Sequence, residues 1–125
     1  MTTFIGDYPC KLDTKGRFAL PSALLKQFGV AEEYRFVIKK DIFENCLVMY
    51  PIQEWERQVA LLREKLNPYN REHNKFLRGF FRGTAEIVLD KSNRMLLPKR
   101  LTEPVSIEKD IRIAGRWAGR FCRTG

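Results

Sequence analysis

An aspartate and an arginine stand four residues apart at two places in the sequence. The pairs are Asp13 with Arg17 and Asp90 with Arg94, and a Leu-Pro follows each arginine. Across a tight turn the two side chains can pair, so one interpretation is that each pair stabilises its own turn. An exposed ion pair contributes only about 0–1 kcal/mol, which is a weak reason to use it twice. A guanidinium held in one orientation can instead bind phosphate oxygens or a guanine edge through two hydrogen bonds.

The residues around these pairs favour an anionic partner. Lys15 and Lys91 lie inside the two turns, where they would attract phosphate. Lys and Arg number 23 against 15 Asp and Glu, a formal net charge of +8. This excess favours nucleic acid, an acidic protein or a membrane surface as partner, and a solvated basic surface is the alternative. We predict a DNA-binding set in which the carboxylates orient the arginines: Arg17, Arg94, Lys15, Lys91, Asp13 and Asp90.

Other classes of function find little support in the sequence. The arginine beside each aspartate should lower the carboxyl pKa and so prevent acid catalysis. No phosphate-binding loop or nucleophile motif occurs. A single His73 and three scattered cysteines are too few to ligate a metal, and they argue against a disulfide framework and favour a reducing cytoplasm. No apolar run approaches the roughly 18–20 residues of a membrane span. We therefore expect no catalytic residue, metal, cofactor, small-molecule substrate or membrane partner.

The two pairs belong to an internal repeat. Residues 12–21 align with residues 89–98 at an offset of 77, and the match continues without a gap to Phe36 and Ile113. Gly16 and Asn93 are equivalent, and these two residue types best tolerate a positive φ, so each motif is predicted to be a strand, a tight turn and a second strand. A short helix should follow each Pro, and closing strands are predicted at 34–39 and 110–114.

A helical insert separates the repeats. A strand is predicted at 45–50, and apolar residues then recur at helical spacing: Ile52, Trp55, Val59, Leu62 and Leu66. Asn67-Pro68 should end this helix and begin the next, with Asn67 as the cap. The second helix carries Phe76, Leu77, Phe80 and Phe81 on one face. These faces either join the internal core or form a subunit interface, for which the candidates are Trp55, Val59, Leu62, Phe76 and Phe80.

The motifs resemble the bacterial MraZ proteins over nearly the whole chain to about Ala114. The resemblance rests on both Asp-x-x-x-Arg units with their Leu-Pro, the opening 4–8 segment Phe-Ile-Gly-Asp-Tyr, and the 47–51 strand before Trp55. It implies a β-rich α+β fold of two AbrB-like, swapped-hairpin (double-split) β-barrel halves in one chain. The halves would form a pseudo-dimer joined by amphipathic helices. The organisation would be a first repeat at 1–51, the insert at 52–83, a second repeat at 84–114 and a basic tail at 115–125.

The resemblance also implies a function. Members of the family bind short direct repeats in the double-stranded DNA upstream of their own division and cell-wall operon and regulate its transcription. They are cytoplasmic, associate with the nucleoid and form ring-like homo-oligomers. Their DNA-binding positions fall here on Asp13, Arg17, Asp90 and Arg94, whereas Lys15 and Lys91 come from charge alone. A different function remains open, in which the chain is a ring-forming assembly protein whose basic loops contact an acidic protein.

The end of the chain departs from the family pattern. After the second repeat the family continues with a strand and a helix, whereas residues 115–125 here are glycine-rich and carry Arg116, Arg120 and Arg123. We therefore expect the second half to lack its last strand and helix. Disorder is one interpretation of this tail, which would then add nonspecific affinity for DNA.

Overall fold

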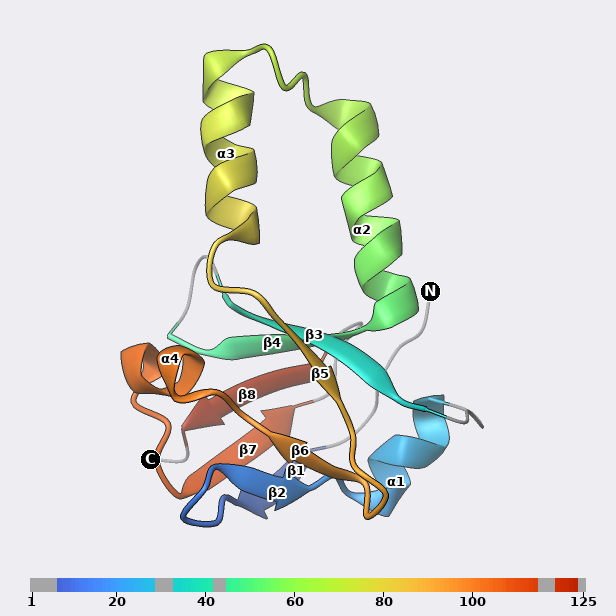
Figure 1. Cartoon of the computed structure of the whole chain (residues 1–125), viewed down its shortest axis with the longest axis vertical. Helices are drawn as coiled ribbons and strands as arrows, with labels where there is room; N and C mark the ends of the chain where they lie inside the picture. The colour runs from blue at the N-terminus through green and yellow to red at the C-terminus, as the bar shows by residue number, and fades with distance from the viewer. Residues whose placement is uncertain (1–6, 29–32, 42–44, 115–118, 124–125) are drawn as a thin grey trace.

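The computed structural model describes residues 7–28, 33–41, 45–114 and 119–123. Their strands form an antiparallel six-stranded sheet in the order β1-β7-β8-β4-β3-β5 and a two-stranded sheet of β2 with β6. The strands are β1 (Asp7–Lys11), β2 (Arg17–Ala19), β3 (Arg35–Lys40), β4 (Leu47–Pro51), β5 (Ala85–Val88), β6 (Arg94–Leu96), β7 (Asp110–Ala114) and β8 (Gly119–Arg123). The fold therefore contains both helices and antiparallel sheets, as the prediction of a β-rich α+β fold expects (Figure 1).

The helices are of two kinds. α1 (Ser22–Leu25) and α4 (Lys99–Thr102) are single turns that follow Pro21 and Pro98, and 3-10 turns at Lys26–Phe28 and Glu103–Val105 extend them. α2 (Ile52–Lys65) and α3 (Arg71–Phe81) are the long helices of the insert. Figure 1 shows these two rising from one end of the molecule, whereas the small β2–β6 sheet lies at the opposite end. No helix among the described residues is long and apolar enough to cross a membrane.

One core joins the two repeats. Four pairs of equivalent apolar residues are buried in the same cluster: Leu12 and Leu89, Phe18 and Met95, Leu20 and Leu97, and Leu24 and Leu101. Phe36, Ile38, Ile111 and Ile113 add the inner face of the large sheet. Burial of each such side chain stabilises the fold by about 1.5–3 kcal/mol. Apolar positions coincide in the two repeats because both sets face this shared core.

Strand pairing relates the repeats to each other. In the β2–β6 pair Phe18 lies opposite its own equivalent, Met95. The Leu20 amide donates to the Asn93 carbonyl at 3.0 Å, and the equivalent bond runs from the Leu97 amide to the Gly16 carbonyl at 2.9 Å. The small sheet is thus built of matching bonds from both repeats, as an isologous contact between two copies would be.

The ungapped alignment of the repeats is wrong beyond the short helices. Tyr8 pairs with Ile113, whereas Ala85, the equivalent of Tyr8, pairs with Ile38. Ile113 therefore corresponds to Ile38 and not to Phe36, a slip of two residues between the short helix and the closing strand. A shift of two keeps every side chain on the same face of a strand, so the hydrophobic pattern does not reveal it.

The expectation that the second half lacks a last strand is also wrong. β8 pairs with β7 through Ile113 and Phe121 and with β4 through Val48 and Arg120. It lies in the predicted tail at 115–125, of which residues 115–118 and 124–125 are outside the described residues. The last strand of the second half is therefore present, in the middle of the large sheet.

The cap and cysteine expectations also need correction. Asn70, and not Asn67, caps α3, because its side chain accepts hydrogen bonds from the amides of Glu72 and His73. The Asn67 side chain instead closes the preceding turn by accepting from the Tyr69 amide at 3.0 Å. Cys10 is a free thiol, whereas Cys46 is bonded in a disulfide, so the argument against disulfides fails at that residue.

Candidate nucleic-acid interface

Asp13 organises the first turn. Its Oδ1 accepts hydrogen bonds from the amides of Lys15 at 2.8 Å and Arg17 at 2.9 Å. The Gly16 amide donates to the Asp13 carbonyl at 3.1 Å, and Gly16 adopts a φ of +87°. An aspartate side chain that bonds the backbone two residues on is a common way to build a turn. The turn presents Lys15 and Arg17 at its exit into β2.

Asp90 repeats the arrangement in the second turn. Its Oδ1 accepts from the amides of Ser92 at 2.8 Å and Arg94 at 2.9 Å. The Asn93 amide donates to the Asp90 carbonyl at 2.9 Å, and Asn93 has a φ of +58°. The predicted equivalence of Gly16 and Asn93 is confirmed, since both occupy the left-handed region that the turn requires.

The two arginines differ in how they are held. The Arg94 Nε lies 3.3 Å from the Asp90 Oδ2, an ion pair between side chains that are about half exposed. Among the residues that the structure describes, the Arg17 guanidinium has no such hydrogen bond or ion pair. Asp13 thus holds the backbone of its arginine, whereas Asp90 holds both the backbone and the guanidinium. The predicted pairing of side chains across the turn is present in the second copy alone.

Both aspartates are fixed as anions. The Arg17 amide, the Lys15 amide and the charges of Arg17 and Arg94 lower the pKa of Asp13. The Arg94 amide, the Ser92 amide and the Arg94 charge lower the pKa of Asp90 in the same way. Protonation of a carboxylate that accepts several N–H bonds costs free energy, because the charged form is the better acceptor. These groups therefore hold their turns together and do not suit proton transfer.

The β2–β6 pair connects the two turns, which lie at opposite ends of this small sheet. Arg17 lies opposite Leu96 and Arg94 opposite Ala19, so each arginine occupies the end of a strand that pairs with the other repeat. The side chains of Asp13, Lys15, Asp90, Lys91 and Arg94 are exposed, and Arg17 is half-buried. Figure 1 shows the two turns at the end of the molecule opposite the insert. The geometry thus presents a basic turn at each end of the small sheet.

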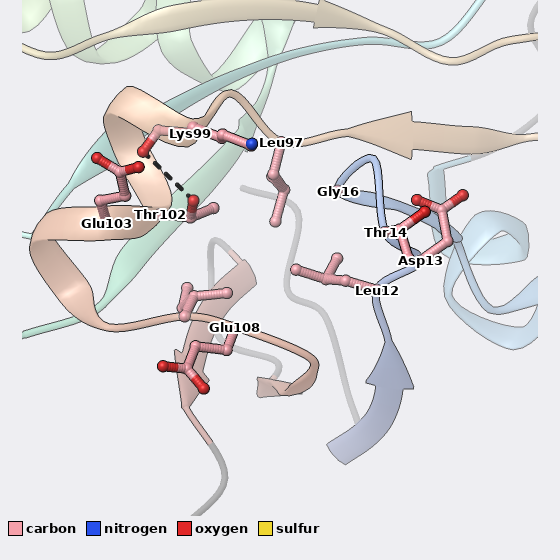
Figure 2. Close-up of a pocket in the computed structure, with 10 residues that line it drawn as sticks. Leu12, Asp13, Thr14, Gly16, Leu97, Lys99, Thr102, Glu103 and Glu108 are labelled. Atoms are coloured by element: carbon pink, nitrogen blue, oxygen red, sulfur yellow. Dashed lines mark hydrogen bonds between the residues drawn. The ribbon is translucent and has the colours of Figure 1, made fainter.

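A hollow of about 180 Å³ lies beside the first turn. Figure 2 shows it between the turn, with Asp13 and Gly16, and α4, where the Thr102 hydroxyl donates to the Lys99 carbonyl at 3.3 Å. Leu12 and Leu97 form its apolar wall, and Glu103 and Glu108 line it as well. The carboxylates make it unsuited to phosphate. We therefore do not assign it to the basic surface, although Asp13 and Gly16 of the first turn line it.

The insert keeps most of its apolar face outside the main core. Val59 and Leu62 are half-buried and Phe76 is 45% exposed, and none of them belongs to the core of the large sheet. Phe80 is the buried member, and its ring stacks on Trp55 with centroids 5.4 Å apart. The interpretation of these faces as internal core therefore fails, apart from Trp55 and Phe80 at the base of the insert.

Lys39 was not among the predicted residues. Its side chain is 3% exposed, and its Nζ lies 3.5 Å from the centroid of the Phe80 ring. Burial lowers the pKa of Lys39 to about 8, with the charge of Asp41 acting in the opposite direction. A lysine in a strand whose neighbours Val37 and Ile38 are apolar is the sequence signal that could have singled it out. This cation connects the large sheet to α3.

Comparison with known proteins supplies the family. A family model described as "MraZ protein, putative antitoxin-like" matches residues 3–78. The protein named transcriptional regulator MraZ of Flavobacterium psychrophilum is 40% identical over 111 residues, which are 89% of this chain and 70% of its own. That of Bacteroides fragilis is 34% identical over 92% of this chain and 73% of its own. That of Syntrophomonas wolfei is 37% identical over 90% and 74%. The chain belongs to the MraZ family.

Proposed function

We propose that this chain is a DNA-binding transcriptional regulator that reads promoter DNA through its two Asp-x-x-x-Arg turns. The observation that carries the proposal is the duplicated turn, in which Asp13 and Asp90 each fix the backbone of an arginine at an end of the β2–β6 pair. Relatives named transcriptional regulator MraZ support it. The target is duplex DNA with short direct repeats upstream of its own division and cell-wall operon, and the protein acts in the cytoplasm at the nucleoid.

In this proposal the arginines recognise the DNA sequence, and the lysines attract the DNA phosphates. A guanidinium can bind a guanine edge or two phosphate oxygens through paired hydrogen bonds. Lys15 and Lys91 are exposed beside the turns, where they contact phosphates and supply affinity without sequence information. The chain comprises two AbrB-like halves, 1–51 and 84–114 with the strand β8 added to the second, related as a pseudo-dimer, with the insert at 52–83. The matching bonds of β2 and β6 support that relation.

The insert supports an assembled form. Trp55, Val59, Leu62, Phe76 and Phe80 line an apolar face that the chain leaves partly exposed. An exposed apolar patch of this kind commonly marks a protein interface. We propose that the face joins copies of this chain in a closed, ring-like homo-oligomer, in which several pairs of turns bind successive DNA repeats.

The test compares DNA upstream of the gene with a shuffled duplex at near-physiological salt. We expect preferential binding of the upstream DNA, and weaker binding by both Arg17→Ala and Arg94→Ala. If each arginine contacts a phosphate, the slope of log affinity against log salt should fall by about 0.9 for each phosphate that the variant no longer binds. Unchanged affinity in both variants would overturn the assignment of the turns. Equal binding to both duplexes, together with salt-sensitive binding of an acidic protein, would favour the assembly function instead.

A further inference from the structure

A line of four cations runs along α3. Arg71, Lys75 and Arg78 lie in the helix and Arg82 directly follows it, at spacings of four, three and four residues. These spacings place all four side chains on one stripe, about 16 Å long at 1.5 Å per residue. All four are exposed. Among the described residues, none of them forms an ion pair.

The stripe lies opposite the apolar face of the same helix. At 100° per residue, Phe80 points well away from both Lys75 and Arg78, and Phe76 points away from Arg78 but lies beside Lys75. Phe80 packs on Trp55 and under Lys39. Lys75 lies at the edge of the hollow that Phe76 and Phe80 line, whereas Arg71, Arg78 and Arg82 do not line it. A lipid surface is disfavoured because Phe80 is buried against Trp55, which leaves little of the aromatic face to insert between lipids.

The stripe is far from the two turns. Figure 1 shows α3 rising from one end of the molecule, while the turns next to β2 and β6 lie at the other. A straight duplex lying across both turns does not run along α3. The stripe is therefore a separate basic surface.

We propose that the stripe of Arg71, Lys75, Arg78 and Arg82 is a second nucleic-acid site, which binds the phosphate backbone of duplex DNA without reading its sequence. Exposed lysines and arginines in a line neutralise successive phosphates and release their counterions. With the turns on one duplex and the stripe on another, one molecule joins two DNA segments. The joining rests on the proposed function of the turns, whereas binding by the stripe does not.

The experiment separates the stripe from the turns. In a parent that carries Arg17→Ala and Arg94→Ala, a stripe variant carries Lys75→Gln and Arg78→Gln. A matched control carries Arg63→Gln and Lys65→Gln, two exposed cations at the end of α2 in the same insert. The probe is a labelled duplex of random sequence, titrated over a range of salt. Circular dichroism checks that all three proteins have the same helix content.

We expect the parent and the control to bind this duplex with similar salt slopes. The stripe variant should bind more weakly, with a slope smaller by about 0.9 for each phosphate that it no longer neutralises. With the turns intact, protein held on a bead-bound duplex should capture a second duplex, and the stripe variant should lose this capture. Binding of the random duplex by the stripe variant as tight as that of the parent would overturn the proposal, and so would an equal loss in the control.

A second experiment tests whether the stripe binds an anionic lipid surface instead of DNA. Vesicles of phosphatidylserine and phosphatidylcholine are mixed with the same three proteins. The proposal expects no difference between the parent and the stripe variant. Vesicle binding that requires Lys75 and Arg78, with unchanged binding of the duplex, would assign the stripe to a membrane and overturn the DNA site.

Discussion

At the residue scale, each aspartate acts on its turn first and on its arginine second. The Oδ1 atoms of Asp13 and Asp90 accept two backbone amides each, whereas one guanidinium of the two is paired. An amide oxygen can replace a carboxylate oxygen as an acceptor at the same position. Loss of the acceptor and loss of the charge are therefore separable by substitution.

Asp90→Ala should weaken DNA binding, whereas Asp90→Asn should retain most of it. The alanine leaves the amides of Ser92 and Arg94 without their acceptor, and the loss of turn order should cost about tenfold in affinity, or about 1.4 kcal/mol. The asparagine keeps the acceptor and gives up the ion pair with Arg94, which is worth at most about 1 kcal/mol. Fluorescence anisotropy with the upstream duplex measures both. An asparagine variant as weak as the alanine variant would show that the carboxylate charge is the important property.

Lys39 makes the stability of the fold depend on pH. Its pKa is near 8 in the folded chain and near 10.5 in the unfolded chain, so the unfolded state binds more protons between these values. Stability should therefore rise with pH through this window, because the cost of a buried charge is removed as Lys39 loses its proton. From pH 7 to pH 9.5 the gain should be about 2 kcal/mol. In Lys39→Met, which keeps an unbranched chain beside Phe80, urea unfolding should show a flatter profile; an unchanged profile would contradict the assignment to Lys39.

At the element scale, the two turns use different residues for one conformation. Gly16 has a φ of +87°, and a Cβ built there would lie 3.1 Å from the Leu97 carbonyl oxygen. Asn93 carries a side chain at a φ of +58°. Because the Leu97 amide also donates to the Gly16 carbonyl, any strain in this turn acts directly on the β2–β6 sheet.

Gly16→Ala should destabilise the fold by about 1–2 kcal/mol, because alanine resists a positive φ and crowds the Leu97 carbonyl. Asn93→Gly serves as its counterpart and should change the free energy of unfolding by less than about 0.5 kcal/mol, since glycine tolerates the same φ. Urea denaturation followed by tryptophan fluorescence compares them. Equal effects in the two variants would mean that the turns are not conformationally equivalent.

The sequence predicts the elements near the turns, but it does not predict the strands and registers that depend on pairing with distant strands. Residue types alone indicated both turns, their flanking strands and the short helices after Pro21 and Pro98, because glycine, asparagine and proline restrict the backbone locally. The hydrophobic pattern cannot reveal the slip of two residues between Ile38 and Ile113, because a shift of two leaves each side chain on the same face of the strand. The strand β8 was missed because its identity depends on partners β4 and β7 rather than on its own residues.

At the scale of the whole molecule, the insert is the part whose apolar face a single chain leaves partly exposed. Trp55 and Phe80 close the base of the insert against the sheet, while Phe76 is 45% exposed farther along α3. A hollow of about 420 Å³ beside Phe76 and Gly79 adds to this open apolar surface. Such a surface favours association, whereas the turns at the other end need no partner chain for their own hydrogen bonds.

Phe76→Glu should therefore dissociate the proposed assembly without unfolding the chain. A charge in the buried centre of an interface opposes association strongly, whereas at an exposed position of the free chain it costs little. Tyr69→Glu, at a side chain that is 96% exposed between α2 and α3, adds the same charge as a control. Sedimentation velocity should show a smaller species for Phe76→Glu and an unchanged one for Tyr69→Glu, with equal thermal stability by circular dichroism. If Phe76→Glu leaves the sedimentation coefficient unchanged, copies of the chain associate through another surface, and affinity for repeated DNA sites should then survive this substitution as well.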